Sequence, residues 1–179
     1  MEKIIPITGI TIAIIATIII IIKDKYNRLY WLKYKIEKGI ENIHEIFIKK
    51  YELNIKYINY IKEKVKINDD TFNNYQNINK EINVNEFNKI IEDMDNDIKE
   101  ILDNNEKILK NKDIHDIQKE IYNENNTING LKKYYNNNVN YYNKISNSFL
   151  IKIIKRLFKY PEYDCLSLEN EEHFKILDE

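Results

Sequence analysis

Apolar and small residues follow one another without a charge from Ile4 to Ile22, and Lys23, Asp24 and Lys25 end this run abruptly. A helix rises about 1.5 Å per residue, so roughly nineteen residues span about 28 Å, close to the thickness of the hydrocarbon core of a bilayer. Backbone amides need hydrogen-bond partners inside lipid, so the run should be helical. The pattern predicts a transmembrane anchor.

The anchor is expected to stay on the mature chain. No cleavage pattern of small residues and no lipid-accepting cysteine follows the run, and a cleaved signal peptide is the alternative. Basic residues are rare before the run and frequent after it. The first six behind it are Lys23, Lys25, Arg28, Lys33, Lys35 and Lys38. This bias predicts a single-pass protein of the cell membrane, with a short N-terminus outside and the following domain in the cytoplasm; the inverted topology is the alternative.

Behind the anchor, apolar residues recur at spacings of three and four, the pattern of one buried face on a helix. Three long stretches carry this pattern, at residues 26–65, 78–109 and 114–149, and the first is narrow enough for a coiled-coil-like seam. A short apolar helix is expected at 151–158, before Pro161. Apolar faces of this kind must be covered, so we expect an antiparallel four-helix bundle.

The fold class predicted from the sequence is therefore all-α, with three parts. Residues 1–25 form the external N-terminus and the transmembrane helix, and residues 26–160 form the cytoplasmic bundle. Residues 161–179 form an acidic tail that is expected to be flexible. The chain contains three Gly and two Pro, which leaves little material for tight hairpins or glycine-rich ligand loops.

The composition argues against several classes of function. A formal net charge of −1 disfavours nucleic-acid binding, although Lys132-Lys133-Tyr134-Tyr135 resembles a basic-aromatic patch locally. Cys165 is the single cysteine and has no nearby His to activate it, so neither a disulfide nor a catalytic thiol is expected. The sequence contains no nucleophile elbow, phosphate-binding loop or paired-cysteine metal motif. We therefore expect no enzymatic activity, no cofactor and no small-molecule substrate.

One pair of residues supports an alternative function. Glu41 and His44 are three residues apart and share a helix face, as in the Glu-x-x-His pairs of di-iron bundles. A second pair is missing, because His115 has Lys112 at the matching position and His173 has Asn170. A metal- or ligand-binding helical enzyme that uses Glu41 and His44 is therefore the alternative, and solvated polar residues are the simpler interpretation.

A repeated Tyr-Asn pair is the least ordinary feature of the sequence. Tyr135-Asn136 and Tyr142-Asn143 are seven residues apart and fall on the same helical stripe. A Tyr buries an apolar ring but its hydroxyl needs a partner, and Asn offers both donors and acceptors. Polar layers of this kind can set the register of a bundle. The spacing favours a structural role, and a surface for a ligand or partner is the alternative.

Two blocks of the chain resemble the LemA family of bacterial membrane proteins. The first, YNRLYWLKYKIEKGIENIHEIFIKKYEL, follows the anchor and is similar to the family's opening helix, and the second, LKKYYNNNVNYYNKISNSFLIKIIKRLF, is similar to its closing Tyr-Asn signature. The family's Trp is replaced by Ile40, and its Pro after the closing Phe by Leu150. The residues of the signature that could form a polar core or a surface are Asn27, Lys49, Lys50, Glu52, Tyr135, Asn136, Tyr142 and Asn143.

The resemblance implies a four-helix bundle that is anchored by one helix and has no assigned catalytic activity. Relatives in magnetosome membranes suggest roles in membrane organisation, which is an analogy at the level of the fold. We therefore expect a non-enzymatic interaction or scaffold module at the cytoplasmic membrane. Its partners would be the lipid bilayer and either another protein or a second copy of the chain.

Overall fold

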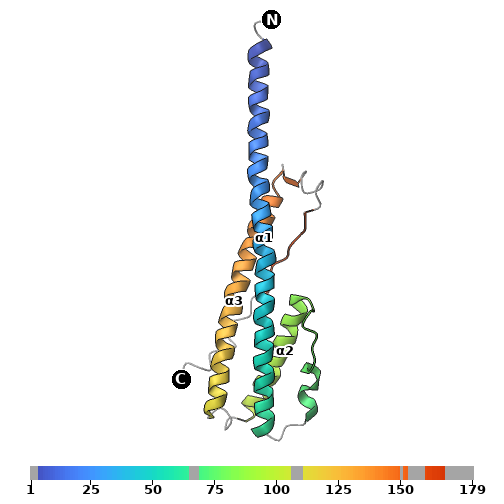
Figure 1. The fold of residues 1–179 in the computed structure, drawn as a ribbon, viewed down its shortest axis with the longest axis vertical. Helices are drawn as coiled ribbons and strands as arrows, with labels where there is room; N and C mark the ends of the chain where they lie inside the picture. Colours follow the sequence, from blue (N-terminus) through green and yellow to red (C-terminus); the bar gives the residue numbers. More distant parts are fainter. Residues whose placement is uncertain (1–3, 65–68, 106–110, 150, 153–159, 168–179) are drawn as a thin grey trace. The chain divides into compact units, whose positions relative to one another are not determined.

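The computed structural model describes residues 4–64, 69–105, 111–149, 151–152 and 160–167. These residues form three α-helices and one 3₁₀ helix, without a strand among them (Figure 1). The all-α prediction is confirmed. The elements are α1 at Ile4–Lys64, η1 at Asp69–Tyr75, α2 at Val84–Asp103 and α3 at Lys112–Ser146.

The helix α1 is uninterrupted over 61 residues. Pro6 does not break it, because Pro lies in the first turn, where its missing amide hydrogen would have no partner within the helix. The sequence predicted that the anchor continues into the first bundle helix. Both stretches belong to α1. None of the helices among the described residues combines the length and the apolarity that a membrane span requires.

The helix α2 begins later than the sequence pattern indicated. Asn77 has a φ of 65°, in the left-handed region, so the chain cannot run helically through this position. Asn83 then caps α2, because its side chain accepts a hydrogen bond of 3.0 Å from the backbone amide of Glu86. The predicted start at residue 78 was therefore wrong, since two Asn residues set the boundary and not the apolar spacing.

The described residues contain three α-helices instead of the four predicted. The expected fourth helix at 151–158 is described only at residues 151–152, which are helical, and its remainder lies outside the described residues. A four-helix bundle is therefore not what the described part of the chain forms.

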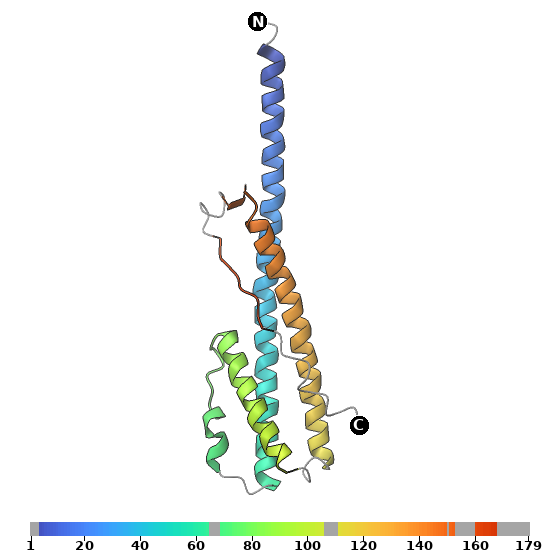
Figure 2. The same cartoon turned by 180° about the vertical axis from the view of Figure 1, so that it is seen from behind.

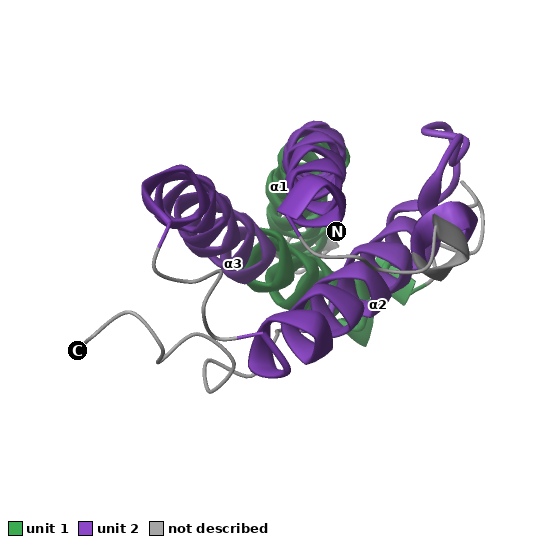
Figure 3. Ribbon diagram, turned by 90° about the horizontal axis from the view of Figure 1, so that it is seen from below, with its two compact units in different colours: residues 1–38, 135–165 green, residues 39–134, 166–179 purple. Residues whose placement is uncertain are grey.

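The chain divides into two compact units, coloured separately in Figure 3. Unit 1 comprises residues 1–38 and 135–165, and unit 2 comprises residues 39–134 and 166–179. The helices α1 and α3 each contribute to both units, whereas η1 and α2 belong to unit 2 alone.

Within unit 2, α2 runs in the same direction as α1, and α3 runs in the opposite direction (Figures 1 and 2). Phe87, near the start of α2, packs on Phe47 with ring centroids 6.3 Å apart, and Asp95, farther along α2, bonds to Asn54, farther along α1. The predicted antiparallel arrangement holds for α3 against α1 but was wrong for α2.

The reason for the parallel arrangement is the return segment between α1 and α2. The hydroxyl of Tyr51 donates a 2.7 Å hydrogen bond to the backbone carbonyl of Tyr75, and Lys80 lies 2.6 Å from the carboxylate of Glu52. Tyr75 and Lys80 therefore lie beside Tyr51 and Glu52, so the chain has already come back from the end of α1 at Lys64 when α2 begins. Apolar periodicity carries no information about such a return.

The core of unit 2 is built from aromatic and aliphatic side chains of all three helices. Phe87 is fully buried and contacts the rings of His44, Phe47 and Tyr51, with centroid distances of 5.6, 6.3 and 5.9 Å. Truncating a buried Phe to Ala typically costs about 3–5 kcal/mol of stability. Apolar side chains in this core include Ile43, Ile58, Ile61, Phe72, Ile91, Met94, Ile114 and Ile128.

Candidate functional site

A charged layer lies inside unit 2, where an apolar core would be expected. The side chain of Lys50, from α1, is fully buried, and its Nζ lies 2.5 Å from Oδ2 of Asp95 on α2. The other carboxylate oxygen accepts a 2.7 Å hydrogen bond from Nδ2 of Asn54, which is also fully buried. One carboxylate of α2, itself partly exposed, therefore binds two buried polar side chains of α1.

A second buried lysine comes from α3. Lys132 is 1% exposed, and its Nζ donates a 2.8 Å hydrogen bond to Oδ1 of Asn88. The same Nζ lies 5.5 Å from the centroid of the Phe47 ring, a cation–π geometry. The amide of Asn88 in turn donates to Glu92. Each buried lysine thus has a polar partner on α2. These two contacts set the positions of α1 and α3 along α2.

Three of the four predicted residues on α1 have different charged partners. Lys49 forms an ion pair with Glu124 of α3, Lys50 binds Asp95 of α2, and Glu52 pairs with Lys80 of the return segment. The lysines are thus split between the two neighbouring helices. Lys50 belongs to the polar core. Lys49 and Glu52 are largely exposed, so their ion pairs contribute less to the stability of the fold.

Asn125 lies beside this layer without a hydrogen-bond partner. It is 2% exposed, and neither its Nδ2 nor its Oδ1 is bonded. It follows Glu124, the partner of Lys49, so it lies at the same level of the bundle as the charged layer. Nothing in the sequence pattern distinguishes this residue from the many other Asn residues of the chain.

In unit 1, the second Tyr-Asn pair holds an extended segment. Tyr142 is fully buried, its hydroxyl donates a 2.9 Å hydrogen bond to the carbonyl of Pro161, and its ring packs edge-on against Tyr163 at 5.1 Å. Nδ2 of Asn143 donates to the carbonyl of Tyr163 at 3.2 Å. The hydroxyl of Tyr163 reaches Glu37 on α1 at 3.3 Å. The pair thus ties residues 160–165 to α3 and α1.

Burial, with smaller contributions from the charges of Glu162 and Glu37, raises the pKa of Tyr142 to about 12. Burial is also the main cause of a raised pKa at Tyr135, with the nearby Cys165 and Asp164 adding to it. Both tyrosines of the repeat are buried, so the structural interpretation of the Tyr-Asn pairs fits their positions. Asn136 is half-buried. Pro161 and Tyr163, which the sequence assigned to the tail at 161–179, accept these two hydrogen bonds through their backbone carbonyls.

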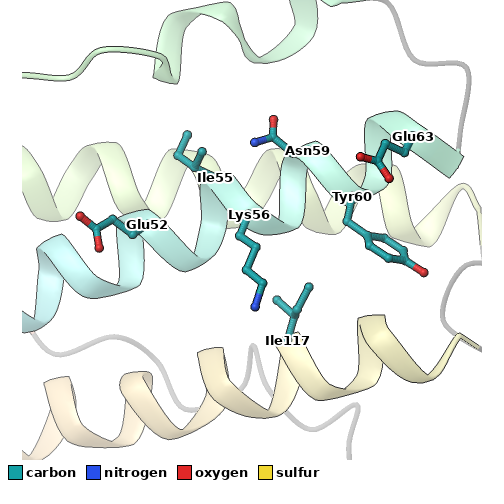
Figure 4. A pocket seen from close by; sticks show the side chains of 7 residues that line it. All are labelled: Glu52, Ile55, Lys56, Asn59, Tyr60, Glu63 and Ile117. Carbon is teal, nitrogen blue, oxygen red and sulfur yellow. The ribbon is translucent and has the colours of Figure 1, made fainter.

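A shallow groove of about 440 Å³ lies between α1 and α3 in unit 2 (Figure 4). Lys56 extends from α1 towards Ile117 of α3, and Tyr60 bonds to Asp113 with an oxygen–oxygen distance of 3.4 Å. The residues that line the groove include both apolar and charged side chains. Its lining residues are Glu52, Ile55, Lys56, Asn59, Tyr60, Glu63 and Ile117.

The sequence model of the LemA family matches residues 39–176, which is more than half of the chain. The chain belongs to the LemA family. Neither a curated relative nor a solved structure matches it. The LemA match includes the charged layer, the groove and both Tyr-Asn pairs, whereas the apolar run and Asn27 precede it. Asn27 is exposed, and nothing in the structure explains its place in the signature.

The predicted alternative of a metal site in this LemA chain finds no geometric support. His44 packs its ring against Phe87, and Glu41 is exposed on the surface of α1. Across the residues that the structure describes, no three His, Cys, Asp or Glu side chains lie together as a metal site would require. Cys165 is exposed, with its Sγ 3.5 Å from Oδ1 of Asn140.

Proposed function

We propose that this LemA-family chain is a non-enzymatic protein-interaction module that residues 4–22 anchor in the cytoplasmic membrane by a single pass. The short N-terminus lies outside, and the helical domain lies in the cytoplasm, where it binds another protein or a second copy of the chain.

The observation that carries the anchor is the exposure of isoleucines along the first part of α1. Helices that are apolar on all sides are either buried or membrane-spanning. The proposal includes residues 4–7, whose side chains are not described; with them the uncharged run reaches about nineteen residues, enough for a bilayer. The exposed isoleucines are Ile10, Ile12, Ile14, Ile15, Ile18, Ile19, Ile20 and Ile21, at 40–67%.

The groove between α1 and α3 supports the binding of a protein. Ile55 and Ile117 offer apolar surface, and Glu52, Lys56 and Glu63 border it with charges of both signs. A shallow, mixed surface of this kind suits a helix or an extended segment of another chain better than a small molecule, which is usually enclosed. The two buried lysines each bind a polar side chain of α2, which supports a structural role for them.

Extraction and labelling test the location. An anchored protein stays in the membrane fraction after alkaline washing and is released only by detergent. Cys165 is exposed and is the single cysteine, so an impermeant maleimide reports its side of the membrane. The proposal predicts labelling only after the cells are permeabilised. Labelling in intact cells would place the domain outside.

Crosslinking in native membranes tests the interaction. We expect a reproducible crosslinked product of the full-length chain that is lost in Ile55→Glu, within the groove, and kept in Asn126→Glu, on the exposed side of α3. A product that persists in Ile55→Glu would rule out the groove as the binding surface.

A further inference from the structure

Three large aromatic side chains lie exposed on α1 shortly after the apolar run. Tyr30 and Trp31 are each 61% exposed and Tyr34 is 51% exposed. The rings of Trp31 and Tyr34 are in edge-to-face contact at 6.2 Å. Leu29 and Ile36, on the opposite face of the helix, are 1% exposed. The aromatic residues therefore form a stripe that points away from the core of unit 1.

The residues around this stripe are predominantly basic. Between residues 23 and 35 there are five basic residues and one acidic residue, Asp24. Arg28 and Lys35 are exposed on the same part of α1. This local excess of positive charge contrasts with the net charge of −1 of the whole chain.

We propose that the stripe of Tyr30, Trp31 and Tyr34, with its basic neighbours, binds the phosphate-bearing headgroups of an anionic membrane surface. Trp and Tyr favour the membrane–water interface, because the ring is apolar and its N–H or O–H stays hydrated. Basic residues next to a membrane anchor are attracted to anionic lipids. The inference rests on the proposed anchor, which would hold the stripe beside the bilayer.

The position of the stripe also implies that α1 tilts in the bilayer towards its aromatic face. Tyr30 lies about 12 Å and Tyr34 about 18 Å along the helix from Ile22, beyond the headgroups if α1 stands upright. Helical side chains lean towards the N-terminus, which brings the rings closer to the lipid. A tilt of α1 by about 20° towards the aromatic face, common for transmembrane helices, lowers the rings by about another 3 Å, so Tyr30 comes nearest to the headgroups.

A second copy of the chain fits this stripe less well than lipid does. Two stripes facing each other would bring their excess positive charges together, which is unfavourable unless other groups compensate. Anionic headgroups complement both the charge and the aromatic rings.

Trp31 is the single tryptophan of the chain, so its fluorescence reports on the stripe directly. The full-length protein is reconstituted into phosphatidylcholine vesicles, with or without phosphatidylglycerol. Quenching of Trp31 is measured with lipids brominated near the headgroup end of the acyl chain and with aqueous acrylamide. The control is the double variant Trp31→Phe/Tyr122→Trp, which moves the probe to an exposed position of α3 in unit 2.

We expect a blue-shifted emission and several-fold stronger quenching by brominated lipid for Trp31 than for the control, with a larger effect when phosphatidylglycerol is present. Arg28→Gln/Lys35→Gln should weaken the dependence on phosphatidylglycerol, and Arg28→Lys/Lys35→Arg should keep it. Acrylamide quenching of Trp31 as strong as that of the control tryptophan would overturn the inference. Shielding from acrylamide without quenching by lipid would also overturn it and would indicate a protein on the stripe.

The same samples separate this inference from the anchor. A protein that floats with the vesicles after an alkaline wash but leaves Trp31 unquenched would retain the anchor and lose the lipid-binding stripe. A protein that the wash releases would lose both.

Discussion

Lys50 and Asp95 meet in the interior of unit 2, with Nζ and Oδ2 2.5 Å apart and the lysine side chain fully buried. The lysine comes from the part of α1 that precedes the return segment, and the aspartate comes from the middle of α2. The pair therefore joins two helices that run parallel, and it fixes how far α2 is shifted along α1.

Removing one partner of this pair should destabilise the protein strongly. Asp95→Ala leaves a buried charge without its carboxylate, so we expect a loss of about 3–5 kcal/mol in the free energy of unfolding. The double variant Lys50→Met/Asp95→Leu removes both charges and should recover most of that loss. Denaturant unfolding of the full-length chain in detergent checks both. A double variant as unstable as Asp95→Ala would show that the pair is not coupled.

Tyr142 should contribute to stability through both its ring and its hydroxyl. We expect Tyr142→Ala to lose about 3–5 kcal/mol, as for other buried aromatic residues. Tyr142→Phe should lose about 1 kcal/mol, the usual net value of the hydrogen bond that it makes to Pro161. Tyr141→Phe, next to it but 61% exposed, is the control and should unfold like the wild type. Equal melting temperatures for Tyr142→Ala and the wild type would place the pair outside the core.

Stability should fall in alkaline solution. Burial raises the pKa of Tyr142 from 10.0 to about 12, so the folded state favours the neutral hydroxyl. The stabilisation is fully present below pH 10 and is lost as the pH rises from about 10 to about 12, because the unfolded chain ionises first. The melting temperature should decrease over this window, and less steeply in Tyr142→Phe. Identical slopes for the two proteins would contradict the assignment to Tyr142.

Asn125 provides a stabilising substitution. Both atoms of its side-chain amide are buried without a hydrogen bond, which is costly compared with an apolar group of similar size. We expect Asn125→Leu to raise the free energy of unfolding by about 1–2 kcal/mol. Asn126→Leu, at the exposed neighbouring position, is the control and should change it little. A destabilised Asn125→Leu would mean that the amide has a polar partner that matters.

The helices themselves could be predicted from the sequence, because spacings of three and four between apolar residues depend only on helical geometry. This pattern located most of α1 and α3. It misplaced the start of α2 and missed the direction of α2, since both depend on Asn77, Asn83 and the contacts of the return segment. Local apolar spacing does not encode such contacts.

The site could be predicted only in part. Lys50 was selected because the LemA signature contains it, and Tyr142 because the Tyr-Asn pair repeats after seven residues, but their partners Asp95 and Pro161 were not. The sequence of α2 contains one weak indication of the charged layer. Asn88 and Asp95 are seven residues apart, and each directly follows a buried apolar residue of α2. A polar residue beside an apolar stripe usually faces solvent, so this signal alone does not identify a buried layer.

The central claim, a membrane-anchored module that binds protein through the groove, is tested most directly by site-specific photo-crosslinking in the native membrane. A photoreactive amino acid replaces Asn59 in the groove, and the same amino acid at Asn126 is the control. The account predicts a discrete crosslinked product, with a second copy or another protein, from position 59 that is absent from position 126. The same products from both positions, or none from position 59, would contradict it.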